Sequence, residues 1–196
     1  MAMPDQWTEI AYVAIADDSG SNEYAFGSIT DTIDIAWGSR DIEAIPTISA
    51  GRVIRFVPED LTEITLEVFP VGITSNGSVP NGLHGWFAGL EPGDTTGLNT
   101  FRRKKFRVSV LWTTVPLGAS DLASGSISAG ESLRFTWYNC YMTDATVSFT
   151  DELLRATVTF KCPPYDRAAN SLIKLEEADG TTLPALGTYS GSAPTP

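Results

Sequence analysis

The sequence predicts an all-β protein, a β-sandwich or small barrel with a long inter-strand loop and a flexible C-terminal arm. Apolar and polar residues alternate with a period of two in several runs, which is the pattern of half-buried strands. Segments rich in Gly, Pro, Asn, Asp and Ser separate these runs, as turns do. With 196 residues the chain can build one well-buried core. We therefore expect a single β domain over residues 1–180 and a flexible arm over 181–196.

The expected strands can be placed in chain order. The first three span residues 7–15, 24–37 and 50–57. Four later runs alternate more clearly: "TEITLEVF" (62–69), "KFRVSVLW" (105–112), "LRFTWYNCYM" (133–142) and "LRATVTFKC" (154–162). Each of these runs has one apolar face for a core and one face for water or a partner.

Helical patterns are weak. The two candidates are "GLHGWFAGLEP", whose glycines disfavour a helix, and "PYDRAANSLI" at 164–173. The first lies in a stretch of little periodicity, about 72–100, that exceeds the ~12–15 residues usual for a loop in a compact domain. Because Trp86 and Phe87 would need a surface to pack against, we expect this loop to be functional.

The residues that enzymes need are missing from the sequence. His84 is the single histidine, it lies between the nearby Gly82 and Gly85, and no nucleophile elbow, phosphate-binding loop or dinucleotide fingerprint occurs. We expect no catalytic residue, no metal site and no cofactor. Cys140 and Cys162 both fall in expected strands, where a disulfide is geometrically possible and two free thiols are favoured. Asn76 begins a glycosylation triplet that also has the composition of a turn.

Charge is distributed unevenly along the chain. The formal net charge is −11, with 24 acidic residues and only 13 basic ones. An acidic surface poor in lysine stays hydrated in strong salt, so a halophilic origin is plausible beside that of an ordinary acidic protein. No run approaches the ~20 apolar residues of a membrane span, and the N-terminus lacks a signal-peptide pattern. We expect no membrane partner.

One run, "FRRKKFRV", concentrates five of the basic residues: Arg102, Arg103, Lys104, Lys105 and Arg107. A nucleic-acid site is one interpretation, but the remaining acidic surface would repel phosphates and no set of stacking aromatic residues is interleaved. A contact with an acidic surface on an identical neighbour explains more, since complementary charge fixes the register of subunits. Asp60, Glu63 and Glu67 are the favoured acidic partners. A solvated strand entry is the third interpretation.

Three stretches together resemble the tail tube (major tail) proteins of long-tailed viruses. They are "IPTISAGRVIRFVPEDLTEITLEVFPV" (45–71), "FRRKKFRVSVLWTT" (101–114) and "FTWYNCYMTDATVSFTDELLRATVTFKCPPYDRAAN" (135–170). They cover somewhat under half of the chain. The family usually carries a helix beside its sheet, which this sequence offers only at 164–173.

The resemblance implies a virion protein, made in the host cytoplasm and built into the tail. It implies six-fold rings of identical subunits that stack into a tube, contacts with other tail proteins, and passage of genomic DNA through the lumen without specific binding. The long loop would bridge successive rings, with Trp86 and Phe87 as its anchors. Two other functions remain open: a capsid or decoration protein, and a carbohydrate-binding module that stacks sugars on Trp86, Phe87 and Trp112.

Overall fold

The computed structural model describes residues 10–18, 23–48, 51–56, 58–68, 104–113, 132–150, 153–178 and 181–191. Nine strands are described: β1 (Ile10–Asp17), β2 (Glu23–Ala36), β3 (Ile42–Pro46), β4 (Arg52–Phe56), β5 (Thr62–Val68), β6 (Phe106–Thr113), β7 (Ser132–Thr150), β8 (Leu153–Cys162) and β9 (Ile173–Ala178). The described residues contain no helix, so the all-β prediction is confirmed for them. It follows that none of the described residues belongs to a membrane-spanning helix.

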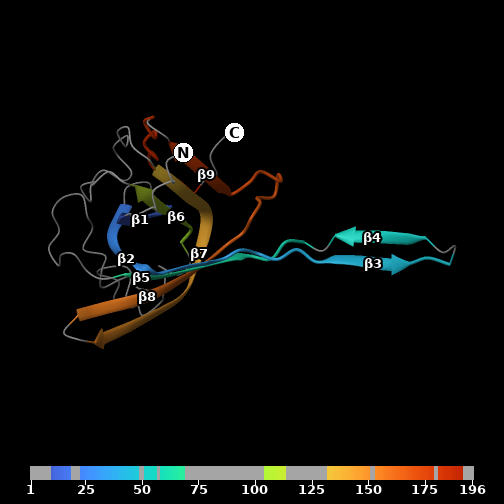
Figure 1. Cartoon of the computed structure of the whole chain (residues 1–196), viewed down its shortest axis with the longest axis horizontal. Coiled ribbons are helices and arrows are strands. Elements are labelled where there is room, and N and C mark those ends of the chain that lie inside the picture. Colours follow the sequence, from blue (N-terminus) through green and yellow to red (C-terminus); the bar gives the residue numbers. More distant parts are fainter. Residues whose placement is uncertain are drawn as a thin grey trace, which may run out of the picture.

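Seven strands form two sheets that share their two longest members. The first sheet contains β2, β1, β6, β7 and β9, and the second contains β2, β5, β8 and β7, with all pairings antiparallel. The N-terminal part of β2 pairs with β1 and its C-terminal part with β5, and β7 likewise passes from one sheet to the other. The fold is therefore a sandwich joined at two corners rather than one closed barrel (Figure 1).

The core lies between the two sheets. It contains the residues that the period-two pattern placed inward, among them Ile64, Leu66, Val108, Val110 and Phe160, all fully buried. Phe106 and Phe160 meet edge to face, with their ring centroids 5.7 Å apart. Removing this apolar surface from water is the main driving force for closing the sandwich.

Strand β7 turns the second corner by means of two β-bulges. Phe106 faces Cys140 while Val108 faces Trp137, so β7 carries one extra residue there. A second extra residue lies between Met142 and Asp144. Asn139 supports the first bulge with a φ of 56°, a left-handed conformation that Asn tolerates better than most residues. Bulges bend the strand that carries them, and Figure 1 shows β7 strongly curved.

A disulfide joins Cys140 to Cys162 between the two bulges. The favoured expectation of two free thiols was wrong. The two cysteines occupy facing positions on neighbouring antiparallel strands, and their Cα atoms are 4.2 Å apart. This spacing is close to the ~4.5 Å of a non-hydrogen-bonded pair, which brings side chains together. The disulfide therefore fastens β8 to the corner of β7.

Two segments differ from the sequence-based expectations. Residues 164–173 form no helix: Tyr165 and Ser171 bridge as antiparallel partners around a turn, and β9 begins at Ile173. The 50–57 strand proves to be one half of a hairpin, because β4 pairs with the unexpected β3. The candidate helix "GLHGWFAGLEP" and the long loop at 72–100 lie outside the described residues.

Candidate assembly surfaces

The β3–β4 hairpin extends away from the sandwich as a narrow arm (Figure 1). Its two strands pair only with each other among the described strands, and every residue of β3 is exposed. Side chains that would be buried in most proteins are exposed here: Ile42, Ile45, Val53 and Ile54, with relative exposures of 62%, 41%, 54% and 59%. Ile48, at the tip, is fully exposed. A contiguous apolar surface on an isolated pair of strands is typical of an interaction site.

The two faces of the hairpin differ. Ile42 and Ile54 lie on one face, since Ile42 is opposite Phe56 and Ala44 is opposite Ile54. The other face carries the pairs Ile45–Val53 and Glu43–Arg55. The first face is therefore mainly apolar, with Arg52 opposite Pro46 as its charged residue, and the other face places a carboxylate two residues from an isoleucine.

The base of the hairpin is fixed to the sandwich. The backbone N–H of Asp60 donates to the carbonyl of Ser39 at 3.0 Å, and Ser39 Oγ donates to Asp60 Oδ2 at 3.1 Å. Gly38 is required beside them, because a Cβ there would overlap the carbonyl oxygen of Asp60. Trp37 packs on Phe135 with a centroid separation of 5.6 Å. Asp60, predicted as part of an acidic contact surface, thus lies at the root of the arm.

The other two residues of the predicted acidic surface, Glu63 and Glu67, lie on the polar face of β5 in the second sheet. Lys161 Nζ lies 3.3 Å from Glu63 Oε2, and both side chains are nearly half exposed. Thr65 and Thr159 share a hydroxyl hydrogen bond on the same face. An exposed pair of this kind contributes ~0–1 kcal/mol, so this face remains available to another surface.

Both edges of the second sheet lack a partner strand among the described residues. At one edge, residues 33–36 of β2 pair only with β5. At the other edge, residues 141–150 of β7 pair only with β8. Unpaired edges present rows of N–H and C=O groups that another chain can complete. Because the two edges lie on opposite sides of one sheet, a head-to-tail contact between copies would continue the sheet from subunit to subunit.

The predicted basic surface is divided by the fold. Arg102 and Arg103 lie outside the described residues. Lys104 forms an ion pair with the buried Asp17, at 3.1 Å between Nζ and Oδ2. Lys105 uses its backbone N–H to donate to Asp18 Oδ2 at 3.3 Å. Of the three described residues of this basic surface, only Lys105 has a charged group without a hydrogen bond or ion pair to the described residues.

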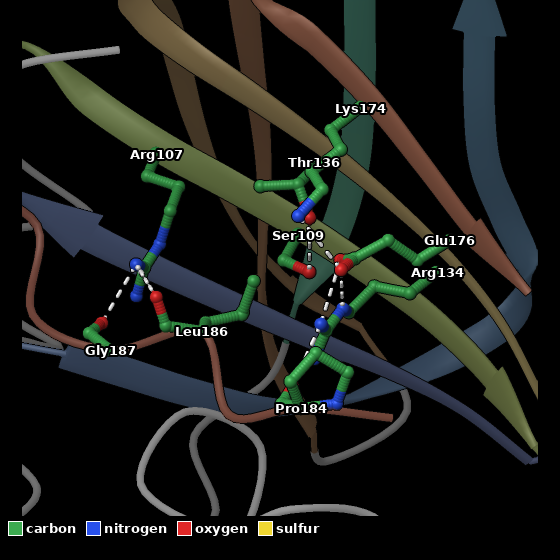
Figure 2. Close-up of polar contacts among 9 residues, drawn as sticks. All are labelled: Arg107, Ser109, Arg134, Thr136, Lys174, Glu176, Pro184, Leu186 and Gly187. Atoms are coloured by element: carbon green, nitrogen blue, oxygen red, sulfur yellow. Dashed lines mark hydrogen bonds and ion pairs between the residues drawn. The ribbon is translucent and has the colours of Figure 1, made fainter. Parts of the chain in front are cut away.

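Arg107 points away from the core, as predicted, but it is buried rather than presented to a neighbour. Its Nη1 donates to the carbonyls of Leu186 at 3.2 Å and Gly187 at 2.8 Å (Figure 2). Its guanidinium also lies 5.9 Å from the ring centroid of Tyr189. This part of the basic surface holds the chain's own C-terminal segment.

A second buried arginine, Arg134 on β7, holds the same segment. Its Nη2 lies 2.7 Å from Glu176 Oε2 on β9 and 2.9 Å from the carbonyl of Pro184 (Figure 2). Burial would raise the pKa of Glu176, but hydrogen bonds from Lys174 and Arg134 outweigh it and hold that pKa below its ordinary value. Ser109 and Thr136 complete this polar layer with a hydroxyl hydrogen bond.

The C-terminal segment 181–191 therefore lies against the first sheet, where a free arm had been expected. Leu183 and Tyr189 are buried. The Tyr189 hydroxyl donates to Asn139 Oδ1 at 2.8 Å, and burial raises its pKa to about 12. The segment shows no period-two alternation, because it lies outside the nine strands and is held by arginine–carbonyl contacts and two apolar side chains.

Trp86 and Phe87 lie outside the described residues, as do His84 and Asn76. Trp112, one ring of the alternative sugar platform, packs edge to face on Phe135 at a centroid distance of 5.9 Å. Among the described side chains, no cluster of His, Cys, Asp and Glu has the arrangement of a metal site.

Comparisons with known proteins return structures alone: no protein-family model and no curated sequence matches the chain. The tube-terminating cap of the anti-feeding prophage aligns with a TM-score of 0.47 and 12% identity, over 91% of this chain and 95% of that one. A sheath/tube terminator of the extracellular contractile injection system PVC aligns at 0.43 and 14%, over 90% and 99%. Hcp1 from Flavobacterium johnsoniae aligns at 0.34 and 14%, over 87% and 97%.

Proposed function

We propose that the chain is a structural subunit that self-assembles into stacked rings of a tail tube. The observation that carries the proposal is the β3–β4 hairpin, an apolar arm with no partner in the described part of the chain. A two-stranded sheet is marginally stable in water by itself, so an arm of this kind gains its stability when a partner covers it. The partner is another copy, which the unpaired edges of the second sheet can bring alongside.

The same edges account for a ring. A head-to-tail contact joins two different surfaces of one protein and closes when the rotation between copies permits. In our proposal residues 33–36 of one copy pair with residues 141–150 of the next, six copies close the ring, and hairpins connect successive rings. Trp86 and Phe87 serve as further anchors between rings.

The polar face of the second sheet gives the tube its lumen. The carboxylates of Glu63 and Glu67 repel DNA phosphates, and the threonines on this face are uncharged. The genome therefore passes through the lumen without specific binding. The tube belongs to a virion tail, whose other proteins bind its ends, and it performs no catalysis. An acidic, lysine-poor chain suits a virus of a halophilic host.

The proposal is tested by imaging concentrated protein by electron microscopy and by sedimentation. We expect rings or tubes from the wild-type chain. The double variant Ile42→Thr/Ile54→Thr keeps strand propensity but removes the apolar face of the hairpin, and it should remain monomeric with an unchanged far-ultraviolet circular dichroism spectrum. Leu175→Thr, at an exposed apolar residue of β9, is the matched control and should assemble.

Two results would overturn the proposal. The first is a wild-type chain that stays monomeric at every concentration and salt level. The second is a double variant that forms rings as readily as the control. If single subunits instead attach to preformed capsid shells, the chain is a capsid or decoration protein.

A further inference from the structure

An open pocket of about 580 Å³ lies at the corner where β7 bends. Its lining includes Lys105, Tyr141, Pro163, Tyr165, Arg167 and Leu172. The fold forms it in two steps. The bulge at Asn139 brings Tyr141 onto the strand's exposed side, and the turn between Tyr165 and Ser171 closes the opposite wall. The pocket is therefore formed jointly by the bend of β7 and the turn that follows β8.

The charges of this pocket are unbalanced. Lys105 Nζ and the Arg167 guanidinium form no hydrogen bond or ion pair with the described residues. The carboxylate of Asp166 also lines the pocket and keeps its negative charge, but its oxygens are already hydrogen-bonded within the turn. It accepts from the backbone N–H groups of Ala168 and Asn170 and from Asn170 Nδ2, each at 2.8 Å. With two cations and one carboxylate, the lining side chains carry a net charge of +1, and both cations can still bind an anionic ligand.

The pocket also offers apolar and aromatic surface. Tyr141 and Tyr165 are 42% and 51% exposed, which is unusually open for aromatic side chains, and Leu172 is buried at the base. Two cations beside two tyrosine rings suit a ligand that carries a carboxylate next to an apolar side chain.

We infer that this pocket receives the Glu43–Ile45 face of the hairpin from a second copy, an inference that rests on the proposed self-assembly. Glu43 supplies the carboxylate for Lys105 and Arg167, and Ile45 packs between the tyrosine rings. Glu43 forms no ion pair within the described residues, although Arg55 lies opposite it on β4. Among the described residues, neither this carboxylate nor the two cations have an ion-pair partner, and complementary charge then fixes how the arm enters.

A nucleic acid is the other ligand with this chemistry. Tyrosines can stack bases, and cations can contact phosphates. A polyanion, however, would have to approach a chain of net charge −11 through two free cations, whereas a hairpin brings a single carboxylate to each pocket. The favoured ligand is therefore the hairpin.

The test compares full-length chains by sedimentation and electron microscopy. The protein concentration needed for ring formation should rise at least about tenfold for Lys105→Glu/Arg167→Glu, the scale expected for charge reversal in an interface. Adding Glu43→Lys to the same chain should restore assembly, because each pocket then presents carboxylates to a lysine on the neighbouring hairpin. Lys161→Glu, a charge reversal on the second sheet, is the matched control and should assemble normally.

The outcomes separate the inference from the proposed function. If Lys105→Glu/Arg167→Glu assembles normally, the pocket is not the receptor, while the proposed function stands on the Ile42→Thr/Ile54→Thr result. If single-stranded oligonucleotide binding is lost in this variant while assembly is kept, the pocket binds nucleic acid and the inference is wrong. Recovery of assembly on adding Glu43→Lys would identify the contact directly.

Discussion

Arg107 Nη1, on β6, donates a 2.8 Å hydrogen bond to the carbonyl of Gly187, 80 residues further along the chain. The contact fixes a segment that lies outside the nine strands. Together with the bond from Arg134 to the carbonyl of Pro184, it holds the C-terminal segment across the first sheet. Both donors are buried, so these bonds form in surroundings where an unpaired polar group is costly.

We predict that Arg107→Met releases residues 181–191. The substitution keeps the length of the side chain but leaves two carbonyls without their donor, which should lower the free energy of unfolding by about 1–3 kcal/mol. Hydrogen exchange should show lost protection over 181–191. Arg52→Met, at an exposed hairpin arginine, is the control. Unchanged protection in the variant would show that the apolar contacts of Leu183 and Tyr189 suffice.

The disulfide is predicted to be present in the isolated protein and to stabilise it. Cys140 and Cys162 are 22 positions apart, and closing a loop of that length stabilises a fold by ~3 kcal/mol in the chain-entropy account. Cys140→Ser/Cys162→Ser should therefore unfold at a lower denaturant concentration. Alkylation of unreduced, unfolded protein followed by mass spectrometry gives an independent check, since two labelled thiols would contradict the disulfide.

Acid should weaken the contact between β7 and β9 through Glu176. Its pKa is lower in the folded state than in the unfolded chain, so the stability it contributes is fully present above about pH 4.3 and is lost as the pH falls through the folded value. Glu176→Gln should flatten the dependence of unfolding free energy on pH in the acid range. Glu177→Gln, at the exposed neighbour, should leave the slope as in the wild type. Parallel curves for all three proteins would refute the role of Glu176.

The turn around Asp166 should depend on its carboxylate. Hydrogen bonds from the side chain and backbone of Asn170, and from the backbone of Ala168, hold the pKa of Asp166 below its ordinary value. Asp166→Ala removes these acceptors, so trypsin should cleave after Arg167 faster than in the wild type. Thr181→Ala, at an exposed residue elsewhere, serves as the control. Equal cleavage rates would mean that the Tyr165–Ser171 bridge alone orders the turn.

Alternation predicted most of the sandwich, because the strands that line the core obey it. "TEITLEVF" and "LRATVTFKC" correspond to β5 and β8 within one or two residues, and their inward residues form the core. Alternation did not predict β3, because every residue of "IEAIP" is exposed and no buried face selects apolar residues at alternate positions. The strand beside it, β4, falls within the strand expected at 50–57.

The alternation of β6 could not predict whether the polar face of this strand is exposed to solvent. The pattern assigned Arg107 and Ser109 correctly to the face opposite Val108, yet that face is buried as well. What covers it is a segment of Pro, Gly, Ser and Thr that carries no periodic signal. Arg167 of the pocket was missed for a similar reason, because its position depends on a turn that only the folded chain brings beside Lys105.

The bulges of β7 determine where this strand can change its length. The inward side chains are Phe135 and Trp137, then Cys140 and Met142, then Ala145, so each bulge shifts the alternation by one residue. Loss of the extra residue at either bulge would keep every one of these side chains facing inward, whereas a deletion elsewhere in β7 would turn the following ones outward. Single-residue deletions in related sequences should therefore fall near Asn139 and Thr143. Each such deletion would alter the angle between the two sheets and leave the composition of the core unchanged.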